Sequence, residues 1–225
     1  MAYNDFNAES PENFEQKCLC VLVLDVSGSM GGAPIKQLNQ GLQEFYQEIS
    51  NDPTTANRLE ISIVTFGSQI TTLQEPALVE KFTMPTLITQ GSTKMVDGIK
   101  EAISKVKARK EWYKSTAQPY YRPWIILMTD GYPDSGQDVT GASAEIEKAV
   151  NDKNFIFFAV GVQGADMKVL TSLSSSAMPP APLQGLKFAQ FFRWLSASMT
   201  TVTSSTDGDK VDLPEPTDWM KGFTI

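Results

Sequence analysis

The chain has 225 residues, of which 41% are hydrophobic and 20% are charged, a composition typical of a globular domain. Its formal net charge of −7 makes nucleic acid and anionic membrane surfaces poor partners and a cation a better one. The absence of histidine excludes Ser-His-Asp and Cys-His catalysis and every zinc site with a histidine ligand, so any metal must be bound by oxygen atoms.

The first residues carry no recognisable targeting signal. Residues 1–16 have neither the basic nor the apolar segment of a secretory signal, and no window approaches 18 uninterrupted apolar residues. We therefore expect a soluble, cytoplasmic protein. The two cysteines, Cys18 and Cys20, would point to the same face of a strand at about the upper separation limit for a disulfide, so we expect small core residues rather than a bridge or a metal site.

The first half of the chain predicts three strands and one helix. CLCVLVLD (18–25) is apolar almost throughout, which is typical of a strand buried on both faces of a parallel sheet. Pro34 suits the first turn of a helix, and apolar residues follow at helical spacing until NDP at 51–53 ends it. LEISIVTF (59–66) predicts a second strand. QITTLQ (69–74) predicts a third, which follows a turn and is therefore antiparallel at an edge.

The second half continues the alternation of strands and helices. Residues 75–92 are rich in Pro and Thr and predict a long surface connection. A helix is expected from about Thr93 to Tyr113, and PWIILMTD (123–130) predicts a fourth strand that again ends in an aspartate. The remaining expected elements are a helix over 141–152, a strand over 155–162, a helix over 166–174, a weak strand near 181–186 and a helix over 187–203.

These elements predict an α/β fold, a doubly wound and mostly parallel six-strand sheet with helices on both faces and one antiparallel edge strand. We expect one domain over 17–203, an N-terminal extension over 1–16 and a polar C-terminal tail over 204–225. Trp219 in the tail is either a strap onto the domain or part of a short linear motif.

Oxygen-bearing side chains gather where the predicted strands end. Asp25 ends the first strand and Asp130 the fourth; ligands of such sheets bind at the carboxyl ends of strands, where the strand order reverses. Ser27 and Ser29 follow Asp25, and Thr93 lies where a loop enters a helix. Two carboxylates and three hydroxyls suit a hard divalent cation, and we expect Mg²⁺, with Mn²⁺ or Ca²⁺ as alternatives.

Each part of this set also has a purely structural interpretation. Aspartate and serine favour turns and helix caps, and Thr93 has the position of an N-cap. The order of the elements, with D-x-S-x-S directly after a buried strand, favours the metal site. Met30, Met95 and Tyr132 are expected near the crevice, where they either contact a partner or pack in the core or rim.

The motifs D-V-S-G-S-M (25–30), G-S-T (91–93) and T-D-G (129–131) resemble the metal-ion-dependent adhesion site of von Willebrand factor A domains. The resemblance implies a six-strand, mostly parallel sheet flanked by helices. It also implies metal binding by five residues, with the hydroxyls as direct ligands and the aspartates as direct or water-mediated ones. A carboxylate from a partner protein, presented by Asp or Glu, would take the open position. The implied metal set is Asp25, Ser27, Ser29, Thr93 and Asp130.

Further segments are similar to the bacterial tellurite-resistance TerY group over roughly 17–203, among them QGSTKMVDGI, YYRPWIILMTDGYPDS and FFAVGV. This likeness implies a role in tellurium resistance and stress response, with a protein kinase and a PP2C-type phosphatase as associated proteins. The chain departs from the group after T-D-G, where Tyr132-Pro133-Asp134 stands in place of a sequence resembling E-P-T-D. The departure affects the expected partner-binding rim, which consists of Met30, Met95, Tyr132 and Asp134.

We therefore expect a non-catalytic, metal-dependent adaptor, with a metal-dependent phosphoester hydrolase as the alternative. An aspartate at the tip of the first strand is similar to the nucleophile of haloacid-dehalogenase-type phosphatases. In this chain Ser27 stands where those enzymes have a general acid. The sequence also lacks a G-x-S-x-G elbow and a phosphate-binding G-x-x-x-x-G-K-[ST] loop.

Overall fold

One six-stranded sheet forms the centre of the protein in the computed structural model, which describes residues 13–162, 164–176, 178–206, 210–216 and 219–220. The strand order is β3-β2-β1-β4-β5-β6; β3 runs antiparallel to β2, and the other neighbouring pairs are parallel. The α/β doubly wound fold expected from the sequence is therefore confirmed. The strands are β1 (Cys18–Asp25), β2 (Leu59–Phe66), β3 (Ile70–Leu78), β4 (Trp124–Thr129), β5 (Ile156–Gly161) and β6 (Ala181–Pro182).

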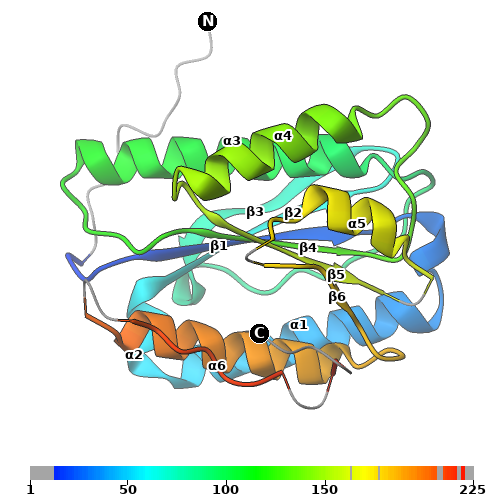
Figure 1. Cartoon of the computed structure of the whole chain (residues 1–225). Coiled ribbons are helices and arrows are strands. Elements are labelled where there is room, and N and C mark those ends of the chain that lie inside the picture. The colour runs from blue at the N-terminus through cyan, green and yellow to red at the C-terminus, as the bar shows by residue number, and fades with distance from the viewer. Residues whose placement is uncertain (1–12, 163, 177, 207–209, 217–218, 221–225) are drawn as a thin grey trace, which may run out of the picture.

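Helices cover both faces of this sheet (Figure 1). One face carries α1 (Ala33–Asn51), α2 (Pro53–Arg58) and α6 (Phe188–Ser204), and the other carries α3 (Met95–Ser115), α4 (Val139–Asn151) and α5 (Met167–Leu173). Two short 3-10 turns, η2 (Gly28–Met30) and η3 (Val79–Lys81), complete the list. In the part of the chain that the structure describes, none of the helices has the length and apolarity needed to cross a bilayer.

Strand β1 lies in the middle of the sheet, which explains its nearly continuous apolar sequence. All eight of its residues are buried. Cys18, Cys20 and Leu22 belong to the core beneath α1 and α6, whereas Leu19 and Val21 belong to the core beneath α3 and α4. Both cysteines are free and fully buried, as expected for core residues, and desolvation raises the pKa of the Cys18 thiol to about 12.

Several element boundaries differ from the sequence-based expectation. The sequence NDP ends α1, as predicted, but it also begins α2, because the Asp52 side chain accepts a hydrogen bond from the Thr55 N–H at 2.7 Å and Pro53 occupies the first turn. Strand β3 continues through Pro76 into the stretch that was expected to be a surface connection. An edge strand tolerates proline, because one side of the strand has no neighbour to receive its backbone hydrogen bonds. The sixth strand is shorter than predicted, since β6 has only two residues.

The C-terminal tail packs onto the domain. Trp219 is 1% exposed, and its ring lies 5.1 Å from that of Phe191 and 5.3 Å from that of Trp194. The backbone N–H of Gln184 donates to the Trp219 carbonyl, and the Trp194 indole donates to the Pro214 carbonyl at 2.7 Å. Of the two expectations for Trp219, the structure therefore has the strap.

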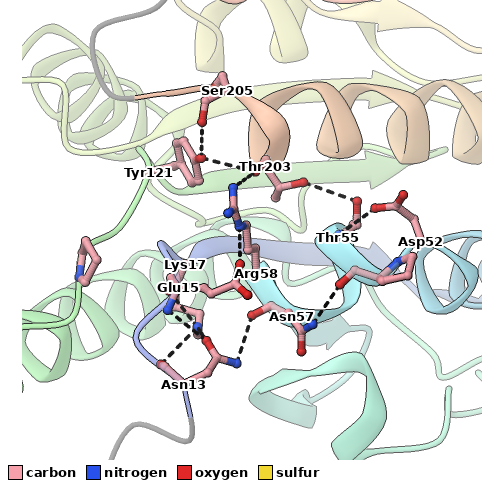
Figure 2. A network of polar contacts seen from close by, with 12 residues as sticks. Asn13, Glu15, Lys17, Asp52, Thr55, Asn57, Arg58, Tyr121, Thr203 and Ser205 are labelled. Carbon is pink, nitrogen blue, oxygen red and sulfur yellow. Dashed lines mark hydrogen bonds and ion pairs between the residues drawn. The ribbon is translucent and has the colours of Figure 1, made fainter.

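The end of the sheet at which β1 begins is held together by polar contacts (Figure 2). Arg58, at the end of α2, donates to the Glu15 carboxylate at 2.6 Å and to the Thr203 carbonyl at 2.5 Å. Tyr121 donates to the Ser205 carbonyl at 2.6 Å. These bonds attach the segment before β1 and the loop before β4 to the end of α6.

Candidate metal centre

The predicted site residues lie together at the opposite end of the sheet, where β1 and β4 end. Strand β1 pairs with β2 on one side and with β4 on the other, so the strand order reverses at β1. The register aligns Leu24 with Met128, which places Asp25 beside Thr129 and one residue from the level of Asp130. Such a reversal opens a crevice at the carboxyl ends of the strands.

Asp25 is the deepest residue of the candidate site. It is fully buried; its Oδ1 accepts the Ser27 N–H at 2.7 Å, and its Oδ2 accepts the Thr129 hydroxyl. Desolvation raises the pKa of Asp25, the hydrogen bonds from Ser27 and Thr129 oppose that rise, and the charge of Asp130 adds to it. A carboxylate that is buried beside another carboxylate lacks a neutralising charge, which a bound cation would supply.

The two serines connect the first loop to Asp130. The 3-10 turn η2 brings the Ser27 and Ser29 hydroxyl oxygens within 3.0 Å of each other. Ser29 also donates to Asp130 Oδ1 at 2.8 Å, across 101 positions of sequence. Desolvation raises the pKa of Asp130, and the hydrogen bond from Ser29 opposes the rise.

Thr93 lies close to the same crevice. A methyl group added to Gly131 would lie 3.8 Å from the Thr93 hydroxyl oxygen and 4.0 Å from Asp25 Oδ2. Both oxygens therefore lie close to Gly131, where a larger side chain would come into contact with them. The first loop is also joined to the Thr93 loop through the Gly28 N–H, which donates to the Gly91 carbonyl at 2.9 Å.

The expected partner-binding rim is only partly accessible. Met30 and Met95 are fully buried in the two cores, so of the expectations for these two residues the structure has core packing and not an exposed position at the rim. The η2 turn and the first turn of α3 direct these apolar side chains inward, where their burial stabilises the fold. Tyr132 is 63% exposed and lies at the rim. Asp134 is half-buried, and its carboxylate accepts the Thr93 N–H at 2.9 Å.

Thr129 is a contributor that the sequence analysis did not identify. Its hydroxyl donates to Asp25 and also accepts the Gly131 N–H at 3.2 Å, so it orients the buried carboxylate. The signal was present in the sequence, because the threonine of T-D-G occupies the last position of a strand next to the one that ends in Asp25.

The donor set fits a hard cation. The crevice supplies two carboxylates and three hydroxyls, and oxygen ligands of this kind suit Mg²⁺ and, with looser geometry, Ca²⁺. Within the described residues, His, Cys, Asp and Glu form no group of three or more that could hold a metal. A metal in this crevice would therefore depend on the hydroxyl oxygens as well as on the carboxylates.

Known structures share this architecture at low sequence identity. The pilus adhesin SpaC of Lactobacillus rhamnosus GG in its open conformation has a TM-score of 0.68 and 15% identity, over 84% of this chain and 30% of SpaC. The ArnB paralog VWA2 of Sulfolobus acidocaldarius has a TM-score of 0.57 and 20% sequence identity, over 81% of this chain and 45% of VWA2. The vWF domain of the type V pili tip protein Mfa5 of Porphyromonas gingivalis has a TM-score of 0.58 and 12% sequence identity, over 87% of this chain and 99% of the Mfa5 domain. At these identities the likeness concerns the fold alone.

The chain thus spans less than half the length of SpaC and of VWA2. A search of curated protein sequences found no match. The family model for the von Willebrand factor type A domain matches residues 20–181, a range that includes most of β1, all of β4 and all five candidate metal ligands. This fold is a general protein-interaction and adhesion module. The chain therefore belongs to the von Willebrand factor type A domain family.

Proposed function

We propose that this chain is a non-catalytic adaptor that binds a partner protein through a divalent cation at the crevice between β1 and β4. The observation that carries the proposal is the bonded path from Ser27 through Ser29 to Asp130, beside the buried Asp25. Neither a turn nor a helix cap requires these residues to meet. The proposed ligands are Asp25, Ser27, Ser29, Thr93 and Asp130, and the proposed ion is Mg²⁺, with Mn²⁺ or Ca²⁺ as alternatives.

The surrounding residues suit the capture of an acidic side chain. Bound in the crevice, the ion supplies positive charge and an open coordination position for a carboxylate. Ser29 is exposed and therefore lies at the entrance of the crevice. Asp25 is buried, and it accepts hydrogen bonds from Ser27 and Thr129. Tyr132 provides an exposed aromatic surface next to this entrance. A partner that presents Asp or Glu beside an apolar residue would match both features.

The biological setting is proposed from the resemblance to the TerY group. It suggests a cytoplasmic role in tellurium resistance and stress response, with a protein kinase and a PP2C-type phosphatase as partners. A strain that lacks the gene should be more sensitive to tellurite, and a plasmid copy should restore growth. Unchanged sensitivity would contradict the proposed setting, whereas the metal-dependent binding would stand on its own measurements.

Metal binding is tested by calorimetric titration of Mg²⁺ into the wild type and into Asp25→Asn. We expect the isosteric variant to lose binding, because it removes one of only two carboxylates in the site. Asp152→Asn is the matched control, since Asp152 lies exposed at the end of α4. Equal Mg²⁺ affinity in the wild type and in Asp25→Asn would contradict the proposal.

Partner binding is tested by co-purification with the proposed kinase and phosphatase in the presence of Mg²⁺ or EDTA. We expect capture with Mg²⁺ and its loss both with EDTA and in Asp25→Asn. The chain purified by itself, without the kinase and the phosphatase, should not hydrolyse p-nitrophenyl phosphate in Mg²⁺. Turnover that Asp25→Asn abolishes would favour the hydrolase over the adaptor.

A further inference from the structure

We propose that Asp134 and Gln137, in the loop between β4 and α4, are positioning residues for the metal centre because they fix the loop that carries Thr93. This inference rests on the proposed function. It gives Asp134 a role different from the partner contact expected from the sequence, and it adds Gln137, which the sequence analysis did not consider.

Asp134 and Thr93 are joined by two hydrogen bonds. The Thr93 N–H donates to Asp134 Oδ1 at 2.9 Å, and the Asp134 N–H donates to the Thr93 carbonyl at 2.9 Å. Two bonds between one pair of residues restrict the rotation of Thr93 as well as its distance. The backbone of this proposed ligand is therefore fixed from another loop.

Gln137 fixes the next residues of the same segment. The N-cap of α3 is Lys94, which makes no capping hydrogen bond with its side chain. Instead the Val96 N–H donates to Gln137 Oε1 at 2.7 Å, and Gln137 Nε2 donates to Asp97 Oδ2 at 2.9 Å. One of the backbone donors that a helix leaves unpaired in its first turn is thus satisfied by a side chain 41 positions away.

The loop that makes these contacts also carries Asp130. It begins at Asp130, which accepts the Ser29 hydroxyl, and it ends at Asp138, which caps α4 by accepting the Gly141 N–H at 2.8 Å. Asp134 and Gln137 lie between these two fixed points. They therefore set the distance between the two loops that supply Asp130 and Thr93, which come from separate elements of the fold.

This arrangement predicts a specific effect on metal affinity. Partners that orient metal ligands typically change affinity by about ten- to a hundred-fold when they are removed. We expect Asp134→Ala and Gln137→Met to weaken Mg²⁺ binding by about that factor. Asp134→Asn keeps an oxygen that can accept the Thr93 N–H, so we expect it to retain nearly the wild-type affinity.

The asparagine variant separates positioning from a charge effect. If Asp134 acts through its negative charge, as a metal ligand or as a rim carboxylate, Asp134→Asn will be as weak as Asp134→Ala. Asp138→Ala is the matched control, because the same side chain is lost from the same loop but its capping contact is to α4 alone. We expect it to lower stability while it leaves Mg²⁺ affinity near that of the wild type.

The measurements are calorimetric titration with MgCl₂ and amide hydrogen exchange at Thr93 and Val96 in EDTA. Faster exchange at Thr93 in Asp134→Ala, restored in Asp134→Asn, supports the inference without metal. Wild-type affinity in Asp134→Ala overturns it, as does equal weakness of the alanine and asparagine variants or of Asp138→Ala. If the wild type binds no Mg²⁺, the proposed function fails as well. This outcome can be told apart from a failure of the positioning inference alone, because it is seen in the wild type before any variant is compared.

Discussion

Replacement of Trp219 by alanine is expected to lower the free energy of unfolding by about 3–5 kcal/mol, the range for removal of a large aromatic side chain from a core. The side chain is 1% exposed, and a buried tryptophan removes roughly 200 Å² from water. At about 25 cal/mol per Å² this area corresponds to about 5 kcal/mol, which is an upper value because the unfolded chain already buries part of it.

The indole N–H makes the phenylalanine variant informative. Among the described residues, Trp219 Nε1 is buried without a hydrogen-bond partner. A buried donor without a partner costs about 1–3 kcal/mol, and phenylalanine removes that donor while it retains most of the ring contacts with Phe191 and Trp194. We therefore expect Trp219→Phe to be much less destabilising than Trp219→Ala.

Urea unfolding followed by far-UV circular dichroism measures both variants, because that signal does not depend on the tryptophan that is removed. Ile88→Ala is the control, since Ile88 is 71% exposed and should change stability by less than about 0.5 kcal/mol. A loss below about 1 kcal/mol in Trp219→Ala would refute the reasoning, because the tail would then not belong to the cooperatively folded core.

Three further predictions concern buried contacts. Glu60→Gln should lower the free energy of unfolding by about 3–5 kcal/mol, because it removes the negative charge that lies 2.6 Å from the buried Arg109 guanidinium; urea unfolding measures this. Gly41→Ala should cost about 1–3 kcal/mol in the same assay, because the added methyl would lie 2.7 Å from Phe192 Cδ2 where α1 meets α6. Asp25→Asn should raise the melting temperature in EDTA, where it removes a buried charge, and should reduce the stabilisation that Mg²⁺ confers.

Each of these predictions has a control and an opposing outcome. The exposed pair of Lys107 and Glu145 should contribute less than about 1 kcal/mol, and an equal effect at Glu60 would refute the burial argument. A more stable Gly41→Ala would mean that helix propensity outweighs the close contact between the helices. A lower melting temperature of Asp25→Asn in EDTA would mean that the lost hydrogen bonds outweigh the relief of the buried charge.

The sequence was most informative where a local pattern of residues determines the structure. The apolar run of β1 predicted a strand buried on both faces, and the order of D-x-S-x-S, G-S-T and T-D-G predicted residues that the fold does gather at one edge. Both follow from strand periodicity and from the rule that ligands bind at the carboxyl ends of parallel strands.

The sequence was less informative where distant segments decide the outcome. Met30 and Met95 lie within two positions of proposed ligands in the chain, but backbone geometry turns their side chains into the core. Arg109 lies on α3 among other basic residues, yet it is 6% exposed and paired with Glu60 across 49 positions, which no local pattern indicates. Hydrogen bonds between loops, such as that from Val96 to Gln137, leave no periodic pattern to read.

The two buried thiols on β1 give this protein an internal reporter of opening. Because Cys18 and Cys20 are the only cysteines and are fully inaccessible, a thiol reagent can modify them only when the central strand separates from its neighbours. The rate of modification therefore measures how often the strand that ends in Asp25 becomes exposed, in the unmodified wild-type chain. An ion that binds only the closed form would slow that chemistry in proportion to its occupancy.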